Sequence, residues 1–107
     1  MVEILTAGEA LVDWVSTESG ADLEAARHWV KAPGGAPLNV AVGLARLGAK
    51  AGFAGCLADD AFGAWLRAVM AAEGVDTRLA AVAAGAQTRM AYVVTTAGGD
   101  RHLAAFS

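Results

Sequence analysis

Short apolar runs alternate with a helical pattern along the first part of the chain. Residues 2–7 form an apolar, β-branched run that ends at Gly8, and residues 50–55 predict the next strand. Short runs bounded by glycine are typical of strands buried inside a sheet. Residues 38–47 lie between them, are almost all apolar and stop at Gly48, which predicts a helix buried on most of its surface. This order of strand, helix and strand indicates an α/β fold.

A second helix has the clearest amphipathic pattern of the sequence. Its apolar side chains recur at helical spacing, at Phe62, Trp65, Leu66, Val69 and Met70. Either Asp59 or Asp60 is suited to cap the start of this helix, and Gly74 follows its end. The stripe predicts core packing against one face of the sheet rather than a cofactor site.

The last part of the chain has a different pattern. Two β-rich runs within residues 88–106 flank Gly98-Gly99-Asp100, which is a strong hairpin signal. Residues 16–22 are polar and predict a loop, and residues 25–32 predict a short strand that contains His28. No second histidine or carboxylate stands at a metal-ligand spacing from His28, so the sequence predicts no metal site.

A glycine pair, Gly34 and Gly35, stands at the mouth of the apolar helix. The pair removes the Cβ atoms that would keep a ligand away from the backbone, and Pro37 presets the backbone angle at the helix start. Asn39 in the first turn offers both a donor and an acceptor, which suits a polyhydroxylated ligand. The alternative is that Asn39 caps its own helix and that the glycines only make a turn.

Three blocks of the sequence carry a resemblance to a known family. They are GEALVDWV, GGAPLNVAVGLARLGAKAGFAGCLADDAFG and TRMAYVVTTAGGDRHLAAF. In this order they resemble the amino-terminal part of the ribokinase-like, or PfkB-type, carbohydrate kinases. The segments TRMAYV and GDRHLAAF look most like the fructokinase branch. One position departs, because Ala58 stands where the family pattern usually has glycine. The resemblance implies an α/β fold with a ribokinase-like, Rossmann-type sheet, flanking helices and a small β lid, whose strands lie near residues 14–33 and 87–107.

The resemblance also implies which residues bind substrate. These are Asp13, Gly34, Gly35, Asn39, Arg89 and Phe106. In the family the aspartate of the first block binds sugar hydroxyls, and Asp13 matches it here; the alternative is a solvated loop carboxylate. Arg89, Arg101 and Phe106 lie in the block that supplies the lid, although each is equally suited to an exposed hairpin. Fructose is the leading substrate by resemblance, and related kinases take ribose, ketodeoxygluconate, adenosine or other nucleosides.

The chemistry of phosphate transfer is not visible in these residues. The sequence has neither a G-x-x-x-x-G-K-[ST] loop nor a G-x-G-x-x-G motif after a strand. In the resembling kinases, which use ATP and Mg, the catalytic base and the anion hole come from a downstream G-A-G-D type motif. The chain stops at Ser107 within a strand-like run. We therefore expect residues 1–107 to be the amino-terminal part of a single kinase domain whose ATP-binding half is absent, with no catalytic residue, no bound cofactor and no phosphate transfer of its own.

The composition limits the kinds of binding partner and the cellular compartment that we expect for this protein. A net charge of −3 offers no electrostatic footprint for nucleic acid or an anionic membrane, and no apolar run is long enough to span a bilayer. The lone Cys56 forms no internal disulfide, and the acidic start at residues 1–3 lacks the basic region of a secretory signal. We expect a cytoplasmic protein with a small-molecule sugar substrate, and the resemblance implies a homodimer of the parent through its lid.

Two hypotheses that assign the chain to a functional class other than enzymes stay open at this point. One is a complete, non-catalytic module that binds a small sugar or nucleoside through Asp13 and Asn39. The other is a helix-turn-helix interaction module, suggested by the segment VGLARLG. The acidic charge balance argues against the second, because binding to nucleic acid needs exposed basic residues.

Overall fold

The computed structural model describes residues 2–107 and divides the chain into two compact units. Unit 1 contains the segment up to Leu11 and the segment Pro33–Thr88, and unit 2 contains Val12–Ala32 and Arg89–Ser107. The chain therefore crosses between the units after Leu11, after Ala32 and after Thr88.

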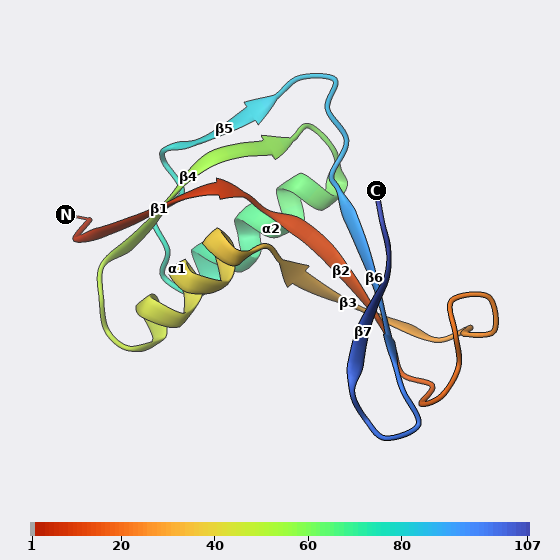
Figure 1. Cartoon of the computed structure of the whole chain (residues 1–107). Coiled ribbons are helices and arrows are strands. Elements are labelled where there is room, and N and C mark those ends of the chain that lie inside the picture. Colours follow the sequence, from red (N-terminus) through yellow and green to blue (C-terminus); the bar gives the residue numbers. More distant parts are fainter. Residues whose placement is uncertain (1) are drawn as a thin grey trace. The chain divides into compact units, whose positions relative to one another are not determined.

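Unit 1 is built on a parallel sheet with helices on one side (Figure 1). Its strands, in the spatial order β1-β4-β5, are β1 (Ile4–Glu9), β4 (Ala51–Ala58) and β5 (Ala80–Ala83). Its helices are α1 (Ala36–Arg46) and α2 (Ala61–Ala72). Each helix precedes the next parallel strand, and right-handed crossovers in one direction bring both helices to the same face. The predicted alternation of strand and helix is confirmed. The expected burial of the first strand is wrong for this structure, because β1 lies at the edge of the sheet and its side chains are mostly exposed.

The core of unit 1 lies between β4 and the two helices. The largest fully buried side chains there are Phe53 on β4, Leu38 on α1, and Leu66 and Met70 on α2. Leu66 and Met70 belong to the predicted amphipathic stripe, whose other members, including Trp65, are half-buried. The stripe is thus confirmed as packing against the sheet.

Helix α1 differs from its prediction. Only Leu38 and Ala41 are buried, whereas Val40 is 51% exposed and Leu47, just after the helix, is 86% exposed. The expectation of a helix buried on most of its surface is therefore wrong for this structure. The physical reason is that α1 packs through one side against β1 and β4, so an all-apolar sequence leaves its other side uncovered.

Unit 2 is built on a mixed sheet of four strands in the order β3-β2-β6-β7. The strands are β2 (Leu11–Ser16), β3 (Trp29–Gly34), β6 (Met90–Thr95) and β7 (Arg101–Phe106). Strand β6 pairs in parallel with β2 and antiparallel with β7, which confirms the predicted hairpin. The hairpin turn closes with a hydrogen bond of 2.7 Å from Thr96 N to Asp100 O.

Two strands lie differently from the sequence interpretation. The strand predicted over residues 25–32 begins only at Trp29, because the Asp22 carboxylate accepts from Ala25 N at 3.0 Å and holds the preceding residues in a turn. Strand β5 was not predicted at all. Its four residues pair with β4 on one side, and a run this short carries no periodicity that distinguishes it from a loop.

No helix within residues 2–107 is both long enough and apolar enough to cross a membrane.

Candidate functional site

The glycine pair of unit 1 lies where the end of β1 meets the start of α1. Gly35 is the N-cap residue of α1 and has a φ of 96°, a left-handed conformation that favours glycine. A Cβ added to Gly35 would lie 2.7 Å from the carbonyl oxygen of Glu9 at the end of β1. The backbone of this loop therefore approaches β1 as closely as a glycine permits.

A side chain of β1 also holds the start of α1 in place. The hydroxyl of Thr6 donates to the carbonyl oxygen of Pro37 at 2.8 Å. Pro37 lies in the first turn, as predicted, and no side chain caps the helix. The alternative in which Asn39 caps its own helix is therefore wrong. Asn39 is exposed in the first turn, with its backbone N–H donating to Gly35 O at 3.0 Å.

In unit 2, the strand register brings two predicted substrate residues onto one face. Asp13 on β2 pairs with Ala91 on β6, and Ala91 pairs in turn with Phe106 on β7. Residues paired directly across neighbouring strands project to the same side of a sheet. Asp13 and Phe106 thus flank Ala91 in one cross-strand row, which we call the Asp13 face.

Arg89 joins this row through the ring of Phe106. Its guanidinium carbon lies 4.2 Å from the ring centroid, within the range of a cation–π contact. Its Nε donates to the carbonyl oxygen of Ser107 at 3.0 Å, which fixes the guanidinium beside the end of β7. Both residues were predicted separately from the sequence, and the structure makes them a stacked pair.

Asp13 is a half-buried residue within strand β2, so its interpretation as a solvated loop carboxylate is wrong. Burial raises the pKa of its carboxyl, because desolvation disfavours the charged form, and the positive charge of Arg101 opposes this shift without cancelling it. A partly desolvated carboxylate gains from hydroxyl donors, which replace the water that it has lost.

The opposite face of the unit 2 sheet carries aromatic side chains that the sequence analysis did not single out. Trp14 and Tyr92 are paired residues one step along from Asp13 and Ala91, so they project to the other side. Trp14 Nε1 donates to the sulfur of Met90 at 3.2 Å, and Trp29 packs edge-on against Tyr92 with ring centroids 6.1 Å apart. The signal for this face is present in the sequence, because side chains that point to opposite faces alternate along GEALVDWV and TRMAYVV.

A carboxylate in unit 1 makes a cluster of hydrogen bonds that the sequence analysis found only in part. Of the two candidate caps, Asp60 is the N-cap of α2, and its Oδ1 accepts from Gly63 N at 2.7 Å. The same carboxylate accepts from Thr88 Oγ1 at 2.6 Å and from Thr88 N at 2.8 Å. Donation from the hydroxyl and the amide of Thr88 lowers the pKa of Asp60. Nothing in the local pattern indicated Thr88 as a partner, because it lies far along the chain.

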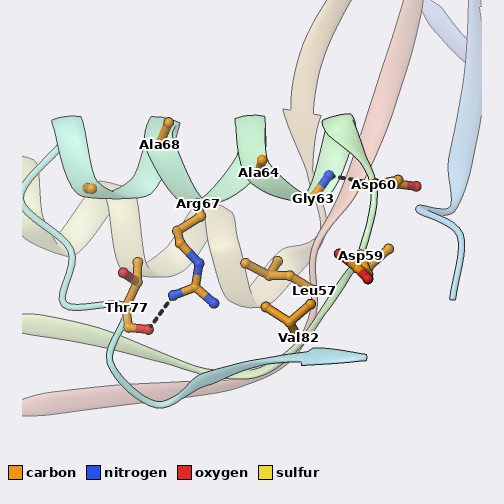
Figure 2. A pocket seen from close by; sticks show the side chains of 11 residues that line it. Leu57, Asp59, Asp60, Gly63, Ala64, Arg67, Ala68, Thr77 and Val82 are labelled. Atoms are coloured by element: carbon orange, nitrogen blue, oxygen red, sulfur yellow. Dashed lines mark hydrogen bonds between the residues drawn. The ribbon is translucent and has the colours of Figure 1, made fainter. Parts of the chain in front are cut away.

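Unit 1 has a pocket of about 420 Å³ between α2 and β5, shown in Figure 2. Its walls are mainly alanine and aliphatic side chains, among them Leu57 and Val82. Arg67 spans it and donates to the carbonyl oxygens of Thr77 at 2.9 Å and Ala80 at 2.6 Å, so its guanidinium ties α2 to β5. None of the predicted substrate residues lines this pocket. We therefore assign it a packing role rather than the sugar site.

The described residues 2–107 contain no group of three or more His, Cys, Asp and Glu side chains placed to hold a metal ion. His28 lies 3.6 Å from a carboxylate oxygen of Glu18, whose other oxygen accepts from the backbone N–H of His28. The His28 imidazole thus forms part of a surface loop.

The predicted site residues fall into two groups. Asp13, Arg89 and Phe106 are brought together on the Asp13 face of unit 2. Gly34, Gly35 and Asn39 are brought together at the start of α1 in unit 1.

Several proteins and solved structures that are similar to this chain are sugar kinases by name. Fructokinase-1 from Oryza sativa subsp. japonica is 47% identical over 98 residues, which cover 92% of this chain and 30% of that protein. The crystal structure of fructokinase from Xylella fastidiosa matches with 38% identity and a TM-score of 0.81, covering 96% of this chain and 31% of that one. An uncharacterized sugar kinase from Pyrococcus horikoshii, solved in complex with ATP, matches with 39% identity and a TM-score of 0.84, covering 94% of this chain and 33% of that one.

The chain spans about a third of the length of these relatives. The α/β, ribokinase-like fold expected from the sequence is confirmed by these structural matches. The family model for the pfkB family carbohydrate kinase matches residues 1–107. On these grounds the chain belongs to the pfkB family of carbohydrate kinases.

Proposed function

We propose that the protein to which this chain belongs transfers a phosphoryl group from ATP to a hydroxyl of a sugar, with fructose as the first candidate. The observation that carries this proposal is the 47% identity to a fructokinase over 92% of the chain. Because the chain covers only 30% of that relative, we attribute the reaction to the whole protein and a part of it to these residues.

The part that we attribute to this chain is recognition of the sugar. The Asp13 carboxylate is an acceptor for two or more sugar hydroxyls, and burial favours its exchange of water for such donors. The Phe106 ring, with Arg89 stacked on it, offers an apolar surface to the carbon face of a sugar. In unit 1, Asn39 offers both an acceptor and a donor, and the backbone at Gly34 and Gly35 carries no Cβ that would keep a ligand away.

ATP is the proposed phosphate donor, supported by the ATP complex of the similar kinase from Pyrococcus horikoshii. Mg²⁺ in such reactions neutralises charge that develops on the phosphates. We place both ligands, together with the catalytic base and the anion hole, on residues outside this chain. We accordingly propose that the isolated chain transfers no phosphate.

We further propose a cytoplasmic location, that unit 2 is the lid implied by the resemblance, and that the whole protein forms a homodimer through this lid. Exposed apolar side chains on its outermost strands support such a pairing, since Val30 on β3 is 53% exposed and Leu103 on β7 is 57% exposed. Sedimentation of the whole protein, with and without a Leu103→Lys substitution, tests the homodimer.

Sugar recognition is tested by calorimetric titration of the whole protein with fructose, ribose and adenosine. We expect fructose to bind most tightly, and the Asp13→Asn variant to lose most of that affinity. Asp22→Asn is the matched control, because Asp22 is an exposed turn residue whose side chain accepts from the amide of Ala25. Equal affinity of the Asp13 variant and the unmodified protein for every sugar would refute the proposed role.

A further inference from the structure

The connection between β5 and β6 contains one buried residue. Residues 84–89 form no strand or helix, and from position 84 to position 90 Thr88 alone is buried, with 9% of its surface exposed. A threonine buried within an exposed connection is held there by specific contacts. For Thr88 these contacts are the two hydrogen bonds that its hydroxyl and its amide donate to Asp60.

Asp60 is itself fixed at the start of α2. Its backbone is extended, with φ −144° and ψ 175°, and its Oδ1 accepts from Gly63 N while accepting from the Thr88 hydroxyl. The start of α2 packs tightly against the end of β4, because a Cβ added to Gly63 would lie 2.0 Å from the carbonyl oxygen of Ala58. Through Asp60, Thr88 is therefore tied to the rigid junction of β4 and α2.

Thr88 is also the last residue of unit 1 before the chain enters unit 2. The next residue, Arg89, accepts a hydrogen bond at its carbonyl oxygen from Val12 N at 3.0 Å. Val12 is the first residue of unit 2 after the earlier crossing that follows Leu11. The first residues of unit 2 after these two crossings, Val12 and Arg89, are thus joined by a hydrogen bond. Thr88 is the residue just before Arg89.

We propose that Asp60 and Thr88 are positioning residues, which clamp the third crossing of the chain to unit 1 and so limit the movement of unit 2. The clamp is defined as the hydrogen bonds between the Asp60 carboxylate and Thr88. Arg89, one residue beyond the clamp, stacks on Phe106 of the Asp13 face. Resting on the proposed function, the clamp acts on sugar binding by restraining the backbone that leads into Arg89. The lowered pKa of Asp60 agrees with a carboxylate that stays charged to accept these bonds.

Thr88→Val tests the clamp, because valine keeps the shape of threonine and the backbone N–H but cannot donate from its side chain. Thr88→Ser is the matched control, since serine restores the hydroxyl. Spin labels at the exposed native Cys56 in unit 1 and at an Ala104→Cys substitution on exposed β7 report the distribution of distances between the units. We expect a broader distribution for Thr88→Val than for the unmodified chain, and the original width for Thr88→Ser.

A distribution of unchanged width in a folded Thr88→Val chain would overturn the proposal and leave Asp60 as a helix cap alone. Should Thr88→Val fail to fold, Asp60→Asn serves instead. Its side-chain oxygen can still accept from Gly63 N and from the Thr88 hydroxyl, while its NH₂ group faces the Thr88 amide and removes that second hydrogen bond of the clamp. The label distances need no ligand, so they test the clamp even if the proposed function fails.

The consequence for activity is measured separately in the whole protein. We expect Thr88→Val to raise KM for the sugar several-fold with a smaller change in kcat, and Thr88→Ser to restore KM. Unchanged KM together with a broadened distance distribution would show that the clamp acts on the units but not on the sugar site.

Discussion

The guanidinium carbon of Arg89 lies 4.2 Å from the centroid of the Phe106 ring. Arg89 immediately precedes β6 and Phe106 is the last residue of β7. Phe106 also shares a cross-strand row with Asp13 through Ala91. An aromatic ring held flat by a stacked cation beside a carboxylate is an arrangement that suits a ring-shaped, hydroxylated ligand. Its consequences can be tested residue by residue.

Replacing Phe106 should weaken sugar binding without unfolding the chain. Its ring is 47% exposed, and a cation–π contact at such a site contributes about 0.5–1 kcal/mol. We expect Phe106→Leu to weaken the affinity for fructose by about two- to fivefold or more. Phe106→Tyr keeps the ring and should bind nearly as well. Calorimetric titration of both variants checks this, and equal affinities for leucine and tyrosine would contradict a role of the ring.

Replacing Asp13 by asparagine should weaken sugar binding without lowering the stability of the folded chain at neutral pH. Burial raises the pKa of its carboxyl above that of the unfolded chain, so its contribution to stability is fully present below the unfolded pKa and is lost as pH rises through the folded pKa. Asn carries no charge, so above that pH we expect Asp13→Asn to unfold no more easily than the unmodified chain. Urea unfolding from pH 3 to pH 7 measures this, and a large loss of stability at pH 7 would contradict it.

The clamp predicts the opposite dependence on pH. Hydrogen bonds from Thr88 lower the folded pKa of Asp60, so its stabilising contribution is present above the unfolded pKa and is lost as pH falls through the folded pKa. We expect Thr88→Val to lower the free energy of unfolding by about 1.5–3 kcal/mol near pH 7, the range for a hydrogen bond to a charged group. The difference should shrink in acid. A difference that is constant with pH would contradict the bond to a charged carboxylate.

Alanine substitutions at Gly35 and Gly48 should distinguish the cost of an unfavourable backbone angle from the cost of a steric clash. Gly35 and Gly48 have φ values of 96° and 94°, but only at Gly35 would a Cβ meet other atoms. Gly48→Ala should therefore cost about 1–2 kcal/mol from conformation alone. Gly35→Ala should cost more, because its Cβ would lie 2.7 Å from Glu9 O. Thermal unfolding of both variants checks this, and equal losses would contradict the tight contact between the glycine loop and β1.

The apolar residues on α2 should contribute unequally to the free energy of unfolding. Replacing a fully buried tryptophan by alanine costs about 3–5 kcal/mol. Trp65 is only half-buried, whereas Leu66 is 1% exposed. We expect Leu66→Ala to cost about 2–5 kcal/mol and Trp65→Ala to cost less than Leu66→Ala. Urea unfolding of the two variants compares them directly, and a larger loss for Trp65 would contradict the packing described here.

Periodic patterns predicted the elements that bury one face against a neighbour. The stripe ending at Met70 and the hairpin at Gly98-Gly99 were both found where expected. Helix α1 was misjudged because its apolar residues carry no pattern that marks which side packs, and β5 was missed because four residues are too few for periodicity. Propensity alone cannot settle either case.

The candidate site was predictable as a set of residues but not as a geometry. Resemblance identified Asp13 and Phe106, yet only the register through Ala91 places them in one row. The bond between Asp60 and Thr88 joins positions 28 residues apart, and nothing local to either one indicates it. Contacts of this kind arise from topology, which brings the end of one connection to the start of a helix.

The most direct test of the account is ATP-dependent phosphorylation of fructose by the whole protein, compared between the unmodified enzyme and Asp13→Asn. The account predicts phosphorylation by the unmodified protein and a fall in kcat/KM of about tenfold or more for the variant, the effect of losing hydrogen bonds to a charged acceptor. Activity that is the same in both proteins, or a protein that phosphorylates no sugar at all, would contradict it.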